Sequence, residues 1–216
     1  MASWESRYAV ERVYIVDDDA SIREALEALL RSHKMSVISF SSARDYIECK
    51  RDDTAACLIL DLQLPDISGL ELQKRLVDEL SPPIIFISGR GDIPSTVQAM
   101  KGGAIEFLTK PVDPEALLPA VRAAFAKDRI KRDQRAELAE LHKRFAQLSR
   151  REKEVLPLVV KGLLNKQSAA ALGITEVTLQ IHRSQIMKKT AADSFADLVR
   201  MASRLGIPID PPGAGD

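Results

Sequence analysis

Three aspartates in a row, Asp17, Asp18 and Asp19, directly follow the short apolar run at residues 13–16. Neighbouring carboxylates repel one another unless a cation lies between them or one of them carries a proton. A solvated turn could hold such a cluster, and so could a metal site. The residue types alone leave both interpretations open.

Further polar residues come at the ends of later apolar runs, namely Asp61, Ser88 and Lys110. A carboxylate can attack phosphorus as a nucleophile and form an acyl phosphate. Mg²⁺ suits that reaction because it takes one or two carboxylates together with water and phosphate oxygens. A lysine ammonium can contact another phosphate oxygen, and a serine hydroxyl can donate to one. These residue types together therefore suit phosphoryl transfer to an aspartate.

The elements that must position these residues can be read from the hydrophobic pattern of the first 125 residues. Short apolar runs alternate with segments of helical spacing, as in Ile22, Leu26 and Leu30. Such an alternation predicts a parallel α/β sheet with helices on both faces. Functional residues then collect at the carboxyl ends of the strands. The predicted strands are residues 12–16, 36–40, 56–60, 83–87 and 104–108.

From residue 113 onwards the pattern is helical. Pro114 suits the first turn of a helix, and Asp113 suits its N-cap. We interpret residues 127–147 as a helical linker. An apolar stripe with 3-4-3 spacing lets this helix either pair with a second copy or rest on its own domain; its members are Leu138, Leu141, Phe145 and Leu148.

After the linker the sequence predicts several short helices. Ser149 and Glu152 fit a capping box at the start of the first one. Gly162 and Gly173 are expected to end two helices, and Thr175 is expected to begin the next.

The last helical pattern, SFADLVRMASRLGI, places Leu198, Met201 and Leu205 on one stripe. Such a stripe fits a domain core and a dimer contact equally well. The residues that follow, 207–216, are rich in Pro and Gly, and we expect them to be disordered.

Composition narrows the class of protein. The 216 residues are 45% hydrophobic and 29% charged, which is typical of a soluble globular protein with one or two domains. No apolar run approaches the ~20 residues of a membrane span, and the first residues lack the apolar segment of a signal peptide. We therefore expect a cytoplasmic protein with no membrane partner. Cys49 and Cys57 form neither a disulfide framework nor a metal motif.

Charge is distributed unevenly although the formal net charge is zero. Residues 1–126 carry 14 Lys and Arg against 20 Asp and Glu, whereas residues 127–204 carry 17 against 9. An acidic half joined to a basic half indicates two separate tasks, the basic one directed at a polyanion. Chance clustering of surface charge is the alternative.

Four motifs between residues 12 and 126 resemble the receiver domain of two-component response regulators. They are VDDD at 16–19, LDLQLPDISGLEL at 60–72, FISGRGD at 86–92 and AIEFLTKPV at 104–112. Their order and spacing also match. The resemblance implies a doubly wound, five-stranded parallel sheet of order 2-1-3-4-5 within a receiver domain of residues 1–126.

The same resemblance implies the roles of the site residues. Asp61 would be the phosphoacceptor, phosphorylated by a partner histidine kinase, and Mg²⁺ would be the cofactor. The implied ligands of the ion are Asp17, Asp18, Asp61 and the backbone carbonyl of Gln63. The residues implied to bind the phosphoryl group or to switch are Ser88, Phe107 and Lys110.

Three details refine this assignment. Phe107 carries no hydroxyl, so it can swing but cannot form the hydrogen bond that a tyrosine would form. We interpret Asp19 as a solvated cap of a helix that begins near Ala20. The Lys110–Pro111 pair fits a plain turn, and it also admits a cis bond that would direct the lysine inward.

Residues 163–189 show a helix, a glycine-containing turn and a second helix, as in a helix-turn-helix. In the second helix Leu179, His182 and Ile186 should pack inward. The face left for a DNA groove carries Gln180, Ile181, Ser184 and Lys188. The residues that flank it as candidates for phosphate contacts are Lys166, Arg183 and Lys189.

Three motifs in this half, LSRREKEVL, GLLNKQSAAALGIT and VTLQIHRSQIMKK, resemble the LuxR-type DNA-binding domain of FixJ-like response regulators. The resemblance implies a helix-turn-helix domain over residues 148–206, with Gln180, Ile181 and Ser184 reading bases. Ser168 departs from the pattern, which usually has a branched apolar residue there, and this weakens the local core. The residues implied to lie at or near DNA are Thr178, Gln180, Ile181, Arg183, Ser184 and Lys188.

These observations predict a transcriptional response regulator rather than an enzyme. Phosphorylation of Asp61 is expected to change the helix at residues 93–101 and to drive formation of a homodimer on promoter DNA, with half-sites about one helical turn apart. A phosphatase or phosphotransferase that uses an aspartyl phosphate is one alternative, but it needs a second carboxylate where this chain has Gln63. A regulator that binds RNA or a protein through its basic half is the other.

Overall fold

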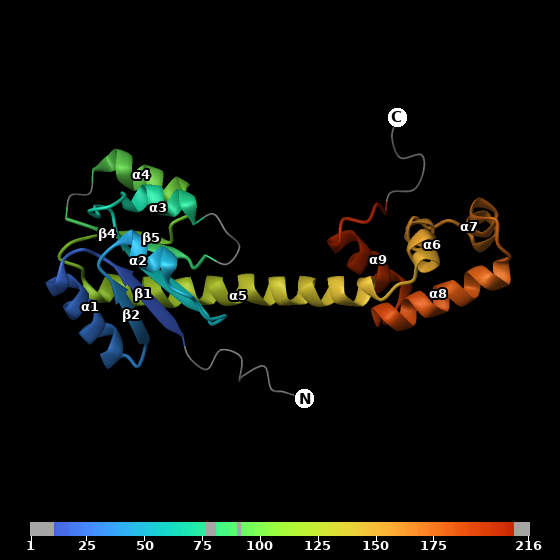
Figure 1. Cartoon of the computed structure of the whole chain (residues 1–216), viewed down its shortest axis with the longest axis horizontal. Coiled ribbons are helices and arrows are strands. Elements are labelled where there is room, and N and C mark those ends of the chain that lie inside the picture. Colours follow the sequence, from blue (N-terminus) through green and yellow to red (C-terminus); the bar gives the residue numbers. More distant parts are fainter. Residues whose placement is uncertain (1–10, 77–80, 90–91, 210–216) are drawn as a thin grey trace. The chain divides into compact units, whose positions relative to one another are not determined.

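The apolar runs of the first half form one parallel sheet in the structure, a computed structural model that describes residues 11–76, 81–89 and 92–209 (Figure 1). The order of the strands is β2-β1-β3-β4-β5, which confirms the predicted topology. The strands are β1 Arg12–Val16, β2 Ser36–Phe40, β3 Ala56–Asp61, β4 Ile84–Ser88 and β5 Glu106–Thr109.

Strand register brings the carboxyl ends of the strands to one edge of the sheet. Val16 of β1 lies opposite Leu60 of β3, so Asp17 and Asp61 both come one residue later. In the next two pairs Asp61 lies opposite Ile87, and Ser88 lies opposite Thr109. The polar residues predicted for the site therefore leave neighbouring strands at one level.

Helices cover both faces of the sheet because the side chains of each strand alternate between two hydrophobic clusters. In β3, Cys57 and Ile59 belong to the cluster that α1 and α5 cover, whereas Leu58 and Leu60 belong to the cluster that α2, α3 and α4 cover. Every residue of β3 is buried, as expected for a central strand. The helices are α1 Ala20–Ser32, α2 Ala43–Glu48, α3 Gly69–Arg75, α4 Ile93–Lys101 and α5 Pro114–Ala146.

The fifth strand begins two residues later than predicted. Gly103 adopts a positive φ of 90°, and the Ala104 N–H donates to the carbonyl of Ala99. The chain at Ala104 is therefore still completing the end of α4, and the strand begins only at Glu106. The apolar pattern alone cannot separate a buried turn from the strand that follows it.

A buried charge network fixes the middle of α5 to the amino end of β3. Asp128 accepts from the Ala56 N–H at 2.8 Å and from the Arg132 Nε at 2.6 Å. Arg132 also pairs with Asp53. Both members of the helical pair are buried, so this contact sets the position of α5 against the strand that ends in Asp61.

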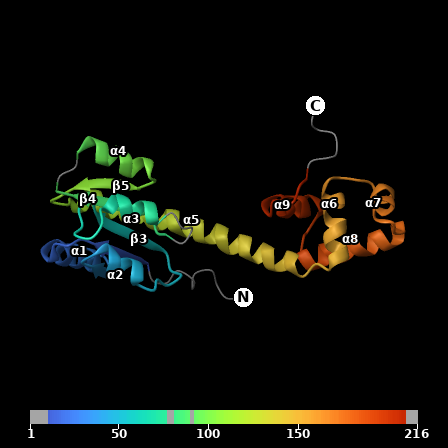
Figure 2. The same ribbon diagram turned by 45° about the horizontal axis from the view of Figure 1, so that its top comes forward.

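Contacts between residues divide the chain into two units, Met1–Arg132 and Asp133–Asp216, and α5 runs across that division. No helix in the described residues is both long and apolar enough to cross a membrane. The second unit is helical (Figure 2), and its further helices are α6 Arg150–Val160, α7 Asn165–Leu172, α8 Glu176–Thr190 and α9 Phe195–Arg204.

The predicted caps are present at the helix ends. Ser149 and Glu152 form the capping box of α6, and the Thr175 side chain accepts from the Thr178 N–H at the start of α8. Gly173 ends α7 in a left-handed conformation with φ 66°, which a glycine adopts without the strain of a side chain.

The sequence left open whether two apolar stripes pack within their own domain or pair with a second copy. In the structure, residues of both stripes pack within the second unit. Phe145 and Leu148, at and after the end of α5, lie in its core. Leu198 of α9 is buried in the same core. Ile207 and Ile209 also pack on it, so the expectation of disorder does not hold at these two residues, while residues 210–216 lie outside the described part.

Ser168 is fully buried in α7, and its hydroxyl has no hydrogen-bond partner. A buried hydroxyl without a partner costs stability, because the group has lost its bonds to water and gained none in return. The sequence predicts that Ser168 weakens the local core. The buried hydroxyl without a hydrogen-bond partner is the physical reason.

We predict that Ser168→Ala raises the free energy of unfolding of the second unit by ~1 kcal/mol, since it removes the unpaired hydroxyl without adding volume. Urea denaturation followed by circular dichroism measures this. Ser184→Ala on α8 is the control, because Ser184 is exposed and its replacement changes only helix propensity. Equal gains in the two variants would contradict the explanation.

Candidate functional site

Three carboxylates meet at the carboxyl edge of the sheet. Asp17 directly follows β1, Asp61 is the last residue of the neighbouring β3, and both are buried, whereas Asp18 is exposed. Each of the three offers an oxygen, and these oxygens lie within 4.8 Å of one another. Oxygen ligands at this spacing fit a hard divalent cation such as Mg²⁺.

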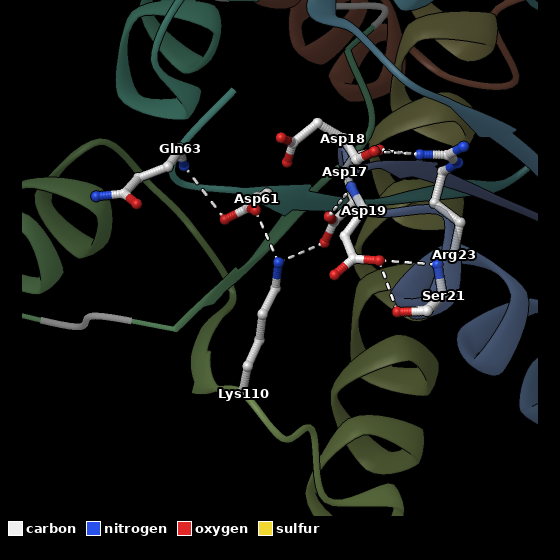
Figure 3. Close-up of polar contacts among 8 residues, drawn as sticks. All are labelled: Asp17, Asp18, Asp19, Ser21, Arg23, Asp61, Gln63 and Lys110. Carbon is white, nitrogen blue, oxygen red and sulfur yellow. Dashed lines mark hydrogen bonds and ion pairs between the residues drawn. The ribbon is translucent and has the colours of Figure 1, made fainter. Parts of the chain in front are cut away.

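Lys110 reaches the same cluster from the loop after β5 (Figure 3). Its ammonium nitrogen lies 2.6 Å from Oδ2 of Asp17 and 2.7 Å from Oδ2 of Asp61. The Lys110 N–H donates to the carbonyl of Ser88 at 2.8 Å, so the backbone of this residue is tied to the end of β4. The Lys110–Pro111 bond is cis, which is the form that would direct the lysine inward.

Burial and neighbouring charges both shift the pKa values of the groups in this cluster. Burial raises the pKa of Asp17, and the nearby Asp61 charge adds to that rise, while Lys110 and the Asp19 N–H oppose it. Burial alone would lower the pKa of Lys110, but the two carboxylates outweigh it and raise the pKa. A single ammonium thus faces two buried carboxylates and an exposed third, which leaves an excess of negative charge for a cation.

The acidic turn itself is held by backbone contacts. The Asp19 N–H donates to Oδ1 of Asp17 at 3.0 Å. Arg23, one turn into α1, donates to the carbonyls of Asp17 at 2.7 Å and Asp18 at 2.9 Å (Figure 3). The Asp19 side chain accepts from the Ser21 N–H, which confirms its prediction as a helix cap. Sequence reasoning missed the role of Arg23, because a basic residue in the first turn of a helix has no fixed partner.

Gly69 is a second residue that sequence reasoning missed. A Cβ at this position would lie 2.3 Å from the backbone oxygen of Asp61 and 3.0 Å from the Phe86 ring. The Gly69 N–H donates to the carbonyl of Leu62 at 2.9 Å, so α3 starts directly against the end of β3. The absence of a side chain therefore allows the close approach that positions Asp61.

The remaining residues predicted for this site lie around it. Gln63 donates its N–H to Oδ1 of Asp61 at 3.2 Å, and its side chain points away from the cluster (Figure 3). Its carbonyl as a metal ligand stays a prediction. Ser88 is buried at the end of β4. Phe107 is half-buried and stacks on Phe86, with ring centroids 6.2 Å apart.

The second unit presents the predicted DNA face on α8. Leu179 and Ile186 are fully buried and His182 is half-buried, in agreement with the predicted inward side. Thr178 is half-buried at the start of the helix. Four of the predicted DNA residues on α8 are exposed, namely Gln180, Ile181, Ser184 and Lys188, and Lys166 is exposed at the start of α7.

Two basic residues assigned to DNA contacts already have partners within the unit. The Lys189 ammonium lies 2.9 and 2.7 Å from the two carboxylate oxygens of Glu152, a buried residue. Arg183 donates to Oδ1 of Asn165 at 2.6 Å and lies over the Phe195 ring. The geometry gives Lys189 a structural role between α8 and α6, because leaving the buried Glu152 carboxylate unpaired would be costly.

Comparison with known proteins gives two matches that together span most of the chain. Residues 13–122 match the response regulator receiver domain, and residues 146–202 match the bacterial regulatory proteins of the luxR family. Nodulation protein W of Bradyrhizobium diazoefficiens is 48% identical over 90% of this chain and 86% of that protein. Response regulator protein TodT of Pseudomonas putida is 46% identical over 89% of this chain and 86% of that protein.

Solved structures agree with these matches. The response regulator StyR has a TM-score of 0.80 and 43% identity, covering 90% of this chain and 99% of that one. Full-length FixJ from B. japonicum has a TM-score of 0.53 and 34% identity, covering 91% of this chain and 98% of that one.

The fold and the acidic site thus define the class: a two-component response regulator built from a receiver domain and a helical DNA-binding domain. The chain belongs to the FixJ-like response regulators of this class, and it is a transcription regulator with a LuxR-type DNA-binding domain.

We predict that Gly69→Ala lowers the free energy of unfolding of the receiver domain by ~3 kcal/mol, because the added Cβ must displace the backbone of Asp61. Urea denaturation measures the loss. Gly89→Ala is the matched control, since a Cβ at Gly89 would meet nothing within 4 Å. Equal stability of the two variants would show that the end of β3 can move without penalty.

Proposed function

We propose that Asp61 accepts a phosphoryl group from a partner histidine kinase and that Mg²⁺ is the ion this reaction requires. The observation that carries the proposal is the meeting of three carboxylates and one ammonium at the same edge of the sheet. Asp17, Asp18 and Asp61 would hold the ion, with the Gln63 carbonyl as a further ligand. When bound, Mg²⁺ supplies positive charge to the phosphoryl oxygens.

The chain's own residues have distinct parts in the transfer. A carboxylate oxygen of Asp61 forms the new bond to phosphorus, while the bond from phosphorus to the kinase's histidine nitrogen breaks. Lys110 already contacts the Asp61 carboxylate, and its ammonium is placed to follow the charge onto a phosphoryl oxygen. The Ser88 hydroxyl would donate to another phosphoryl oxygen, and Phe107 would then change its position against Phe86.

Phosphorylation would be read out by pairing of two copies through α4. Ile93, Val97 and Met100 are large apolar residues that α4 exposes at i, i+4 and i+7, so they form one stripe. An exposed apolar stripe next to the site supports a homodimer that forms when the site is occupied. Two DNA-binding domains would then bind half-sites about one helical turn apart on promoter DNA.

The proposed division of labour follows the predicted limits. Residues 1–126 receive the signal, residues 127–147 link, and residues 148–206 bind duplex DNA. The exposed Lys188 and Lys166 support a polyanion as the partner of residues 148–206.

We further propose that the chain is cytoplasmic and makes no membrane contact. We also propose that it is not an enzyme with a substrate of its own, since Gln63 stands where an aspartyl-phosphate phosphatase needs a carboxylate.

We predict that Asp61→Asn abolishes labelling by acetyl phosphate, because an amide oxygen cannot form the acyl phosphate. Intact-protein mass spectrometry, with Mg²⁺ present and after its removal by EDTA, measures the labelling. Asp52→Asn is the control, since Asp52 is an exposed carboxylate on the loop before β3. Labelling of Asp61→Asn at the level of the unchanged chain would show that Asp61 is not the phosphoacceptor. Labelling of the unchanged chain in EDTA would show that the reaction does not require Mg²⁺.

We predict that Lys188→Ala weakens binding to duplex DNA about fivefold near 0.1 M salt and lowers the salt slope by about 1, because one phosphate contact is lost. Fluorescence anisotropy across a salt series measures both. Lys153→Ala is the matched control, because Lys153 is an exposed lysine of the same unit that lies on α6. Equal effects of the two substitutions would count against α8 as the DNA face. Tighter binding to RNA than to DNA would revive the RNA alternative.

A further inference from the structure

Helix α8 carries large apolar side chains on its outward side as well as on its core side. Leu179 and Ile186 face the core and are fully buried. Val177 and Ile181, in contrast, are 68% and 57% exposed. Val177 is not among the DNA-contacting residues predicted from the sequence.

Val177 and Ile181 form one continuous apolar edge. They are four residues apart, so they lie one turn apart on the same side of α8. Gln180 and Ser184 are exposed beside them, and the exposed Lys188 continues the line toward the end of the helix. The outward stripe of α8 therefore begins apolar, continues with neutral hydrogen-bonding groups and ends with a positive charge.

Charge selects the partner of this stripe. Single exposed apolar residues are common on protein surfaces, but here two adjacent ones share one side of α8 with the exposed Lys188, although the exposed Glu176 comes directly before Val177. Lys188 on the stripe and Lys166 on α7 are exposed cations, and they fit a polyanion better than an apolar protein surface. Among polyanions, duplex DNA offers a groove wide enough to admit a helix.

The major groove offers one apolar group to such an edge. The 5-methyl of thymine is the only alkyl group on the base edges there, and aliphatic side chains contact it. Four residues of helix rise about 6 Å, which is close to two base-pair steps of ~3.4 Å each. Val177 and Ile181 can thus meet two methyl groups about two steps apart when the helix lies along the groove.

We propose that Val177 and Ile181 are specificity-determining residues that read two thymine methyl groups about two base-pair steps apart in each half-site. The inference rests on the proposed function of the second unit as a binder of duplex DNA. It adds the chemical feature of the DNA that is recognised and assigns Val177 to the reading surface.

Replacing thymine by uracil tests the proposal, because it removes the methyl group and leaves every hydrogen-bonding atom of the base in place. The probe is a duplex selected from a random-sequence pool by the full chain in the presence of acetyl phosphate and Mg²⁺. Each thymine of the selected half-site is replaced singly by deoxyuridine, and affinity is measured by fluorescence anisotropy. Two replacements, about two steps apart, should each weaken binding about fourfold.

Two variants assign each methyl group to its side chain. Val177→Ala should lose sensitivity to uracil at one of the two positions, and Ile181→Ala should lose it at the other. Ile130→Ala is the matched control, since Ile130 is 59% exposed but lies on α5 outside the second unit, and it should keep both sensitivities. Circular dichroism melting checks that the variants fold, which we expect because the replaced side chains are exposed and alanine favours helix.

The outcomes separate this inference from the proposed function. Salt-dependent, sequence-specific DNA binding with no response to uracil at any position would overturn the methyl reading and leave the DNA-binding function intact. Sensitivity to uracil that persists unchanged in both variants would also overturn it. Failure of the chain to select any duplex would reject the proposed function itself.

Discussion

The Lys110 ammonium holds together two buried carboxylates that their mutual repulsion would otherwise drive apart. It lies within 2.7 Å of both Asp17 and Asp61, and these two lie at the carboxyl ends of neighbouring parallel strands. A parallel sheet makes this possible, because the carboxyl ends of its strands all reach the same edge. The excess negative charge that remains fits a divalent cation, and the proposed phosphoryl transfer depends on that fit. The rest of the receiver domain maintains this geometry.

Several contacts outside the cluster fix its position. Gly69 lets α3 begin directly against the backbone of Asp61, and Arg23 holds the carbonyls of the acidic turn. At the opposite end of β3, Asp128 accepts from the Ala56 N–H, so the strand that carries Asp61 is anchored at both ends. Buried ion pairs such as Asp128–Arg132 add little net stability, but they disfavour other positions of α5.

In the second unit, one side of α8 packs in the core and the opposite side is left for contact with DNA. Leu179 and Ile186 hold α8 in the core, and Lys189 ties its end to Glu152 of α6. The outward stripe is left with the apolar, polar and basic groups that a DNA groove can accept. Ser168, buried without a hydrogen bond, shows that this small core is not optimised for stability.

The sequence by itself determined a parallel α/β sheet, the helix caps and the identity of the charged residues at the strand ends, because hydrophobic period and cap chemistry are local properties of the chain. The strand order was expected only from the resemblance to receiver domains, and pairing between distant segments establishes it. Only the tertiary structure decided four other features: the start of β5, the place of Gly69 beside Asp61, the partner of Lys189 and the exposure of Val177. The start of β5 depends on the turn that completes α4, and the others depend on a residue that is distant in sequence or on which side of a helix finds a partner. A local pattern shows which groups are available, whereas the packing of the elements decides which of them meet.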